Sequence, residues 1–358
     1  MNVLFPINLF ITNLCNQSCP YCFCKDWITN DEKNTRHISL EDIDAVIDWI
    51  KRASIDVYVH LLGGEPMLHP DIVEIVRRMK RNHINLSIFT NGTGDTETCR
   101  QIIEDDCAKI WLVNINNPNT YTADKWKLLN RNLELMKFRG GDTSTRMEDV
   151  QRLQLGINLY YPNQDFSYFI NLAKKYECPY VRFSLSMPSA SKSNQYVDFE
   201  ELFKIKPTLF EFIRNCVRED IAVGWDCIVP PCIFTAREMS YLTHFTSHFA
   251  SICRPHFDIL DLKAAYCVPM RGILPLYDIR DFSIEEVFEK HTMEAKKYKE
   301  YTLSRCKNCH YFNNGQCQGF CLRYKADLLN QVKEPKMEKA PALDSLGKRF
   351  RHLISSNG

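Results

Sequence analysis

Apolar and polar positions follow two alternating periods along the first half of the chain. Short runs rich in β-branched and aromatic residues predict strands at residues 7–12, 55–62, 86–90, 109–116, 152–160 and 180–186. Between them, apolar residues recur at helical spacing at residues 39–50, 71–80, 96–104, 121–136 and 166–176. This alternation of strands and helices predicts a parallel sheet with crossover helices, an α/β fold.

The pattern changes after residue 188. A polar connector is followed by residues 199–218, which predict a helix pair, and the chain from there to residue 323 is dense in cysteine. The tail is charged, and residues 343–355 predict an amphipathic helix. We therefore expect an α/β domain at 1–190, a helical connector at 191–225, a cysteine-rich domain at 226–323, and a tail or helix at 324–358.

Composition narrows the function classes only slightly. The chain has 358 residues, 45% of them apolar and 25% charged, and a formal net charge of +1. This balance predicts no nucleic-acid or membrane partner, and the basic run at 77–81 is typical of a solvated helix C-terminus. The apolar N-terminus lacks a basic n-region, so it does not resemble a signal peptide. We expect a cytoplasmic protein.

Cysteine is the unusual component of the sequence. The chain has 16 cysteines, and a disulfide scaffold of that density is typical of short secreted domains. In a large chain without a secretion signal, clustered thiols favour metal binding instead. Four cysteines are scattered singly and are best interpreted as buried apolar residues: Cys99, Cys107, Cys178 and Cys216.

The densest thiol group follows the first predicted strand. Cys15, Cys19 and Cys22 lie on one short loop, and thiolates favour soft metals and iron–sulfur clusters. A four-iron cluster normally takes four cysteines, so three leave one iron open. A second motif, Gly63-Gly64-Glu65-Pro66, directly follows the second strand. Both motifs are expected at the carboxyl ends of parallel strands, where such folds bind ligands.

Together the two motifs resemble the radical S-adenosylmethionine (SAM) enzymes. The resemblance implies a partial (β/α)6 barrel over residues 5–190, and a [4Fe–4S] cluster on Cys15, Cys19 and Cys22 whose open iron chelates SAM. It also implies reductive cleavage of SAM to a 5′-deoxyadenosyl radical, with a flavodoxin- or ferredoxin-type electron donor. Cys24 is interpreted as non-ligating, because a fourth thiolate would close the open iron.

The same resemblance implies the residues that contact SAM. The turn of Gly63, Gly64 and Glu65 would accept the methionyl amine, and Tyr21 would lie against the adenine. The segment 113–118 is similar to the family's Val-Ser-Leu-Asp-Gly-Pro pattern, which gives the serine's role to Asn114. Asn158 and Arg182 are weaker candidates; Arg182 could bind the SAM carboxylate or form a structural ion pair.

The C-terminal cysteines resemble the SPASM/twitch extension of this family, which holds one or two auxiliary [4Fe–4S] clusters. Its motifs here are a pair around a predicted hairpin and a later run: Cys253, Cys267, Cys306, Cys309, Cys317 and Cys321. The resemblance implies that Cys253, Cys267 and Cys321 share one cluster, with Cys232 or Cys227 as fourth ligand. Cys306, Cys309 and Cys317 would begin a second.

Three departures from that pattern leave the auxiliary count open. Seven residues separate Cys309 from Cys317, more than in the family, and Leu262 replaces a hairpin glycine. No cysteine follows Cys321. The second cluster could therefore have an open iron or a ligand such as His310, or there is only one auxiliary cluster. A zinc knuckle is the competing interpretation of the Cys-x2-Cys pair.

The predicted activity is that of a maturase or oxidoreductase acting on a peptide or protein by crosslinking, epimerisation or oxidation, because the SPASM family is weighted toward peptides. The barrel begins at the N-terminus and leaves no room for the leader-binding domain that some maturases carry, which counts against a peptide substrate. A separate recognition protein could supply that domain. A sugar or aminocyclitol dehydrogenase or epimerase is the alternative. A non-catalytic iron–sulfur protein is disfavoured by the intact Glu65 and three-cysteine loop. No catalytic acid, base or hydrogen donor can be assigned.

Overall fold

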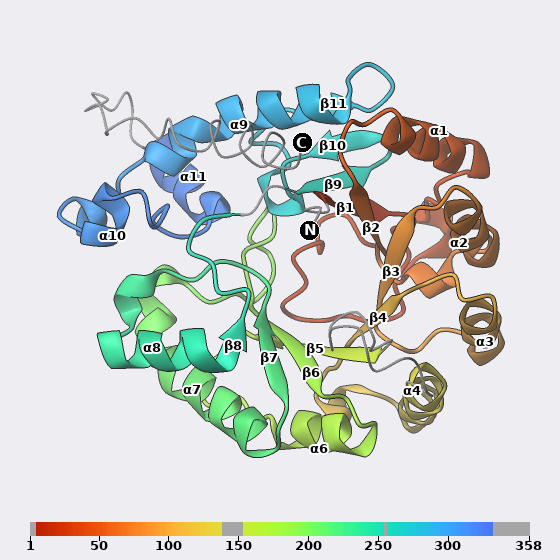
Figure 1. The fold of residues 1–358 in the computed structure, drawn as a ribbon, viewed down its shortest axis with the longest axis horizontal. Helices are drawn as coiled ribbons and strands as arrows, with labels where there is room; N and C mark the ends of the chain where they lie inside the picture. The colour runs from red at the N-terminus through yellow and green to blue at the C-terminus, as the bar shows by residue number, and fades with distance from the viewer. Residues whose placement is uncertain (1–4, 138–152, 254–255, 332–358) are drawn as a thin grey trace.

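The computed structural model describes residues 5–137, 153–253 and 256–331, and Figure 1 shows their fold. The predicted loop at 140–145 and the predicted helix at 343–355 lie outside the described residues. Six strands run parallel in chain order, as the sequence predicts: β1 (Phe5–Phe10), β2 (Val57–Leu62), β3 (Asn85–Thr90), β4 (Ile110–Asn114), β5 (Leu153–Leu159) and β6 (Tyr180–Leu185).

The connecting helices form an outer arc around these strands (Figure 1). They are α1 (Leu40–Lys51), α2 (Ile72–Arg81), α3 (Thr96–Glu104), α4 (Ala123–Met136) and α6 (Ser167–Lys175). Side chains alternate along a strand, and one face of β1 and β2 packs into the main core through Ile7, Leu9, Val59 and Leu61. The other face, turned away from the helices, is therefore the inner surface of the partial barrel.

The sheet continues beyond the six predicted strands on both sides. Its order is β11-β10-β9-β1-β2-β3-β4-β5-β6-β7-β8. The strands β7 (Ala222–Trp225) and β8 (Thr246–Ser247) extend it past β6, while β9 (Phe257–Leu260) pairs in parallel with β1. The strands β10 (Lys263–Ala265) and β11 (Tyr277–Asp278) complete the far edge. The cysteine-rich half therefore shares one sheet with the barrel.

The second half differs from the sequence expectation in three places. The expected helix pair at 199–218 is one helix, α7 (Leu202–Arg218), which contains Pro207 and follows the short 3₁₀ turn η4 (Phe199–Glu201). The expected helical connector also contains β7, because Val223 and Trp225 complete a buried sheet edge. The expected tail begins within a helix, α11 (Leu322–Gln331), since Leu322 and Ala326 pack into a small core.

The remaining helices surround the C-terminal strands and cysteines. They are α8 (Ala236–Phe245), α9 (Ile284–Glu300) and α10 (His310–Asn313). Both α8 and α9 begin with a capping box, in which Thr235 and Ser283 bond the backbone three residues on. These caps explain why the polar, cysteine-rich sequence still forms defined helices.

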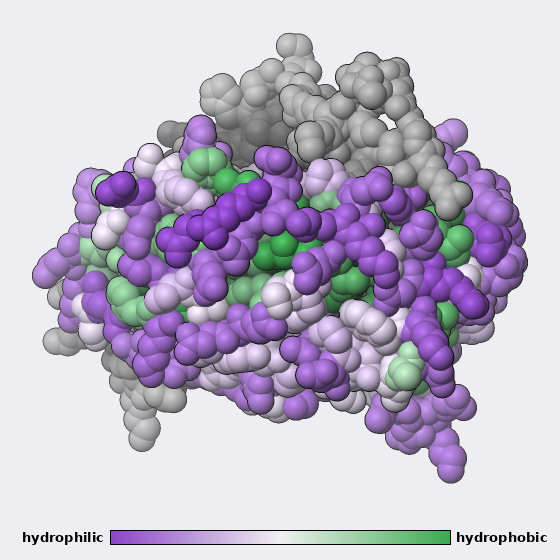
Figure 2. All heavy atoms as spheres, turned by 90° about the horizontal axis from the view of Figure 1, so that it is seen from below, coloured by the Kyte–Doolittle hydropathy of each residue, from purple (hydrophilic) through white to green (hydrophobic). Residues whose placement is uncertain are grey.

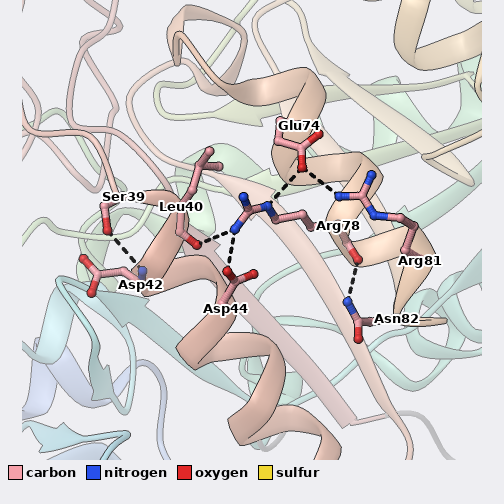
Figure 3. Close-up of polar contacts among 8 residues, drawn as sticks. All are labelled: Ser39, Leu40, Asp42, Asp44, Glu74, Arg78, Arg81 and Asn82. Carbon is pink, nitrogen blue, oxygen red and sulfur yellow. Dashed lines mark hydrogen bonds and ion pairs between the residues drawn. The ribbon is translucent and has the colours of Figure 1, made fainter.

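The side shown in Figure 2 is largely hydrophilic, with hydrophobic side chains visible across its middle. The basic run at the end of α2 is engaged within the protein: Arg78 bonds Glu74, Asp44 and the Leu40 carbonyl, and Arg81 also bonds Glu74 (Figure 3). Among the described residues, every helix is too short or too polar to cross a bilayer.

Candidate active site

The three-cysteine loop leaves the carboxyl end of β1 and is held by backbone hydrogen bonds. The Cys15 amide donates to the Thr29 carbonyl over 2.9 Å, and the Cys22 amide donates to the Cys19 carbonyl over 3.2 Å. Cys15 is buried, while Cys19 and Cys22 are half-buried. The three cysteines thus lie on one constrained loop that follows the carboxyl end of β1.

The glycine turn after β2 packs directly on the backbone that enters this loop. The Gly64 amide donates to the Thr12 carbonyl and the Glu65 amide to the Leu14 carbonyl, both over 2.7 Å. A Cβ on Gly63 would lie 2.3 Å from the Thr12 oxygen, and one on Gly64 would lie 2.1 Å from the Leu14 oxygen. Only glycine permits this approach, so the two motifs form one unit.

The Glu65 carboxylate joins the same unit to β3. It is fully buried and accepts hydrogen bonds from the Met67 amide (3.1 Å), the Thr90 hydroxyl (2.6 Å) and the Asn91 amide (2.7 Å). Burial raises the pKa of Glu65 to about 7, although these donors favour the charged form. This role in joining two strand ends was not evident from the sequence; contact with the SAM amine stays a prediction.

Tyr21, Asn114 and Asn158 form one hydrogen-bonded chain across the strand ends. The Asn114 amide donates to the Tyr21 hydroxyl over 2.7 Å, and the Asn158 amide donates to the Asn114 oxygen over 3.0 Å. The Tyr21 ring also lies 5.0 Å from the ring of Tyr160. The structure therefore brings together three residues that were predicted separately.

Asn116 is a further member of this group that sequence reasoning missed. Its amide donates to the Cys19 Sγ over 3.2 Å, and the Tyr21 hydroxyl donates to its side-chain oxygen. A hydrogen bond to sulfur favours the thiolate form that binds iron. Its position two residues after Asn114, on the same side of the extended segment, was the available signal.

Arg182 lies apart from this group. Its guanidinium pairs with Asp226, which directly follows β7, and lies 5.2 Å from the ring centroid of Phe89. Of the two roles that the sequence left open, the structure shows the ion pair. The SAM-carboxylate role has no support from this geometry.

The comparison with protein families matches this geometry. The model described as "Radical SAM superfamily" matches residues 9–154, which contain both motifs and the strands β2 to β4. This match identifies a radical SAM domain in that part of the chain. Its cofactors are those of the family, a [4Fe–4S] cluster and SAM.

Individual relatives of this radical SAM protein are distant. The GTP 3′,8-cyclase of Lactiplantibacillus plantarum is 28% identical over 205 residues, which cover 55% of this chain and 60% of the cyclase. SuiB of Streptococcus suis, solved with S-adenosylmethionine, shares 15% identity at a TM-score of 0.62, over 93% of this chain and 76% of SuiB. The structure of anSMEcpe with bound AdoMet shares 17% identity at a TM-score of 0.59, over 98% of this chain and 96% of anSMEcpe.

The residues of the loop fit the radical SAM cofactors. The Gln17 side-chain amide in the loop is buried without a hydrogen-bond partner among the described residues, so a donor is available there. Within the described ranges, no three acidic, histidine or cysteine side chains converge on one ion position. A cubane does not require that, because each thiolate binds its own iron.

Cys24 lies directly beside Cys22 of the three-cysteine loop. Its side chain is buried in a small apolar cluster with Phe10, Trp27 and Leu62, against which Cys22 packs. A hydrogen bond from the Cys24 thiol is the main reason that the pKa of Cys22 is lowered. That Cys24 does not bind the cluster stays a prediction.

The C-terminal cysteines separate into two groups of four. Cys253, Cys267 and Cys321 interact electrostatically with one another, and Cys227 interacts with Cys253 and Cys321. Cys306, Cys309 and Cys317 form the other group. Cys232, which the sequence offered together with Cys227 as the fourth member of the first group, lies near the second. His310 is exposed, and its ring lies against the Asn314 amide instead.

The inner face of the barrel carries a row of polar side chains. Asn8, His60 and Ser87 are neighbours in register on β1, β2 and β3. The His60 Nδ1 lies 2.6 Å from the Ser87 hydroxyl, and the Asn8 amide donates to Asp258 on β9 over 2.6 Å. Burial, reinforced by the Arg182 charge, lowers the pKa of His60 to about 3, so the ring is neutral near pH 7.

Proposed function

We propose that this radical SAM protein is an enzyme that removes a hydrogen atom from a peptide or protein substrate. The observation that carries the proposal is the extent of the shared fold. The folds of SuiB and anSMEcpe extend over 93% and 98% of this chain, so the likeness includes the cysteine-rich half. SuiB has also been solved bound to its precursor peptide SuiA. This likeness in fold supports a peptide substrate.

In this proposal Cys15, Cys19 and Cys22 would hold the cluster. When bound, the cluster supplies the electron that cleaves SAM and yields the radical that abstracts hydrogen. The chain's own residues position the parts: Asn116 holds Cys19, Glu65 holds the glycine turn, and the chain of Tyr21, Asn114 and Asn158 forms the wall beside the loop.

The inner face of the barrel suits peptide groups. Asn8, His60 and Ser87 offer neutral hydrogen-bonding groups, which match the donors and acceptors of peptide amides. Arg182, a cation near this row, is already paired with Asp226. The phosphates of a nucleotide triphosphate bind best to free cations, and Arg182 is not one of them.

A nucleotide or other small molecule is the second candidate. The sequence similarity to GTP 3′,8-cyclase favours it, since that relative is named for a reaction of GTP. The same neutral polar row could also bind the hydroxyls of a sugar.

The test is anaerobic turnover with dithionite, SAM and a candidate substrate. The candidates are short peptides encoded beside the gene and, in parallel, GTP. Release of 5′-deoxyadenosine with a mass change in a peptide supports the proposal. A product formed from GTP, with every peptide unchanged, overturns it in favour of the second candidate. No release from protein with a fully loaded first cluster overturns the enzyme assignment itself.

A further inference from the structure

We propose that the second auxiliary site is closed by Cys232, an upstream cysteine that takes the place of the absent downstream one. The second auxiliary site then consists of Cys232, Cys306, Cys309 and Cys317. The first auxiliary site consists of Cys227, Cys253, Cys267 and Cys321. This inference rests on iron–sulfur binding by these cysteines and does not depend on the substrate.

Cys232 and the later cysteines lie on segments that pack against α7 or against the turn directly before it. Cys232 lies on the short 3₁₀ turn η5 (Pro231–Ile233), which packs against α7. The segment carrying Cys306 packs on η4, directly before α7: the Arg305 guanidinium lies 4.7 Å from the Phe199 ring centroid and pairs with Glu200. In Figure 1, α10 lies on the same side of the molecule as α8, the helix that follows η5 in the chain.

Electrostatic interactions place Cys232 with the second group. Cys232 interacts with Cys309, and both Cys306 and Cys317 interact with Cys232. Cys227 has its interactions with Cys253 and Cys321 instead. Although only four residues separate Cys227 from Cys232, the two thiols therefore belong to different groups, and each C-terminal group has four thiols.

Backbone groups in the segment from Cys306 to Cys321 lie close to the sulfurs of its cysteines. The Gly319 amide donates to the Cys317 Sγ over 3.3 Å, and a Cβ on Gly319 would lie 3.5 Å from the Cys306 Sγ. The Cys309 and Cys317 amides are held by the carbonyls of Cys306 and Tyr311. Hydrogen bonds and close backbone approach at sulfur are typical of iron–sulfur ligation.

A buried cation lies between the two groups. Lys325 is fully buried, and its ammonium donates to the Lys299 carbonyl (3.0 Å) and the Gln318 carbonyl (2.7 Å). Within the described ranges it has no carboxylate partner, but it interacts electrostatically with Cys306 and Cys317 of one site and Cys253 of the other. A buried charge needs a counter-charge, and thiolates bound to two anionic clusters would provide it.

The consequence concerns how substrate is held. With four thiolates at each auxiliary site, every auxiliary iron has a protein ligand. The only open iron is then the one left by Cys15, Cys19 and Cys22. Substrate therefore does not bind directly to an auxiliary iron.

The test uses full-length protein carrying Cys15→Ala, Cys19→Ala and Cys22→Ala, reconstituted anaerobically with iron and sulfide. We expect about eight irons, from two [4Fe–4S] clusters. Adding Cys232→Ala should lower the count and produce the EPR signal of an oxidised three-iron cluster. Because Cys232 is exposed, this change should leave the circular dichroism spectrum unaltered. Adding Cys216→Ala, a buried cysteine of α7, is the control and should change neither iron nor EPR signal.

Double variants assign Cys232 to one site. The iron losses caused by two substitutions should be additive when the two cysteines bind separate clusters, and not additive when they bind the same cluster. Cys232→Ala should therefore add little iron loss to Cys306→Ala and a further loss to Cys253→Ala. An unchanged count and EPR spectrum in Cys232→Ala would overturn the inference, as would non-additivity with Cys253→Ala instead. One equivalent of zinc and only about four irons in the variant lacking Cys15, Cys19 and Cys22 would contradict the proposed second cluster.

Discussion

Glu65 shows how one side chain can hold a cofactor site together. Its carboxylate bonds the residues after β2 to the end of β3, next to the three-cysteine loop. A carboxylate in that position is satisfied by hydrogen bonds but loses its hydration, and burial is the larger effect on its pKa. The residue therefore couples the stability of the site to pH.

This coupling has a definite sign. The pKa of Glu65 rises from 4.5 to about 7 on folding, so folding favours the protonated form. The resulting stabilisation is fully present below pH 4.5 and is lost as pH rises through 7. Between pH 4.5 and 8, the unfolding free energy of the wild type should therefore fall by about 3 kcal/mol. We expect this fall to be absent in Glu65→Gln. The variant should also be less stable at low pH, because an amide nitrogen cannot accept from the Asn91 amide.

Chemical denaturation of wild type and Glu65→Gln without SAM, across that pH range, measures the difference. Glu289→Gln is a matched control, since Glu289 lies on α9 and is exposed. Parallel pH profiles for wild type and Glu65→Gln would contradict the prediction.

At the scale of elements, α11 reaches both groups of C-terminal cysteines through Lys325. The helix follows Cys321 directly, and Lys325 donates to the carbonyls of Gln318 and Lys299. The sequence predicted a tail or helix at 324–358 but placed its helix at 343–355. The apolar positions Leu322 and Ala326 of α11 pack against Met270 and Tyr298, and that packing forms the helix.

We expect Lys325→Met to lower the reduction potentials of both auxiliary clusters. Removing a buried positive charge makes an added electron less favourable, while methionine keeps the apolar volume of the stem. EPR-monitored redox titration of the variant lacking Cys15, Cys19 and Cys22 measures this. Lys307→Met, an exposed lysine in the same cysteine run, should leave the potentials unchanged. Equal potentials in Lys325→Met and the parent would show that the cation does not act on the clusters.

At the scale of the whole molecule, one sheet unites the barrel and the cysteine-rich half. The first strand, β1, lies between β2 and β9 and pairs in parallel with both. The Asn8 amide and Asp258 add a side-chain bond across the same junction. Because β9 covers the β1 edge, the barrel depends on residues far along the chain.

Truncation after residue 250 should therefore expose the edge of β1. An uncovered apolar strand edge is a site of aggregation, so we expect a largely insoluble protein or soluble oligomers by size-exclusion chromatography. Removing residues 332–358 keeps every described element and should leave the protein monodisperse to the same degree as the full chain. A soluble, monomeric 1–250 fragment with a loaded first cluster would contradict the prediction.

The sequence by itself determined what short-range spacing can encode. Cys15, Cys19 and Cys22 lie within one loop, and Gly63-Gly64-Glu65-Pro66 follows one strand, so their grouping needs no long-range contact. The two hydrophobic periods likewise predicted six parallel strands and their helices, because amphipathic spacing reports burial directly. The position of these motifs at strand ends then followed from the parallel fold.

Only the tertiary structure decided which distant residues meet. Cys227 and Cys232 are close in sequence and chemically identical, yet they interact with different cysteine groups. The pairing of Arg182 with Asp226 and of β9 with β1 also joins segments that lie far apart in the sequence. Spacing along the sequence cannot predict such contacts, because they depend on how the segments between the two residues pack in three dimensions.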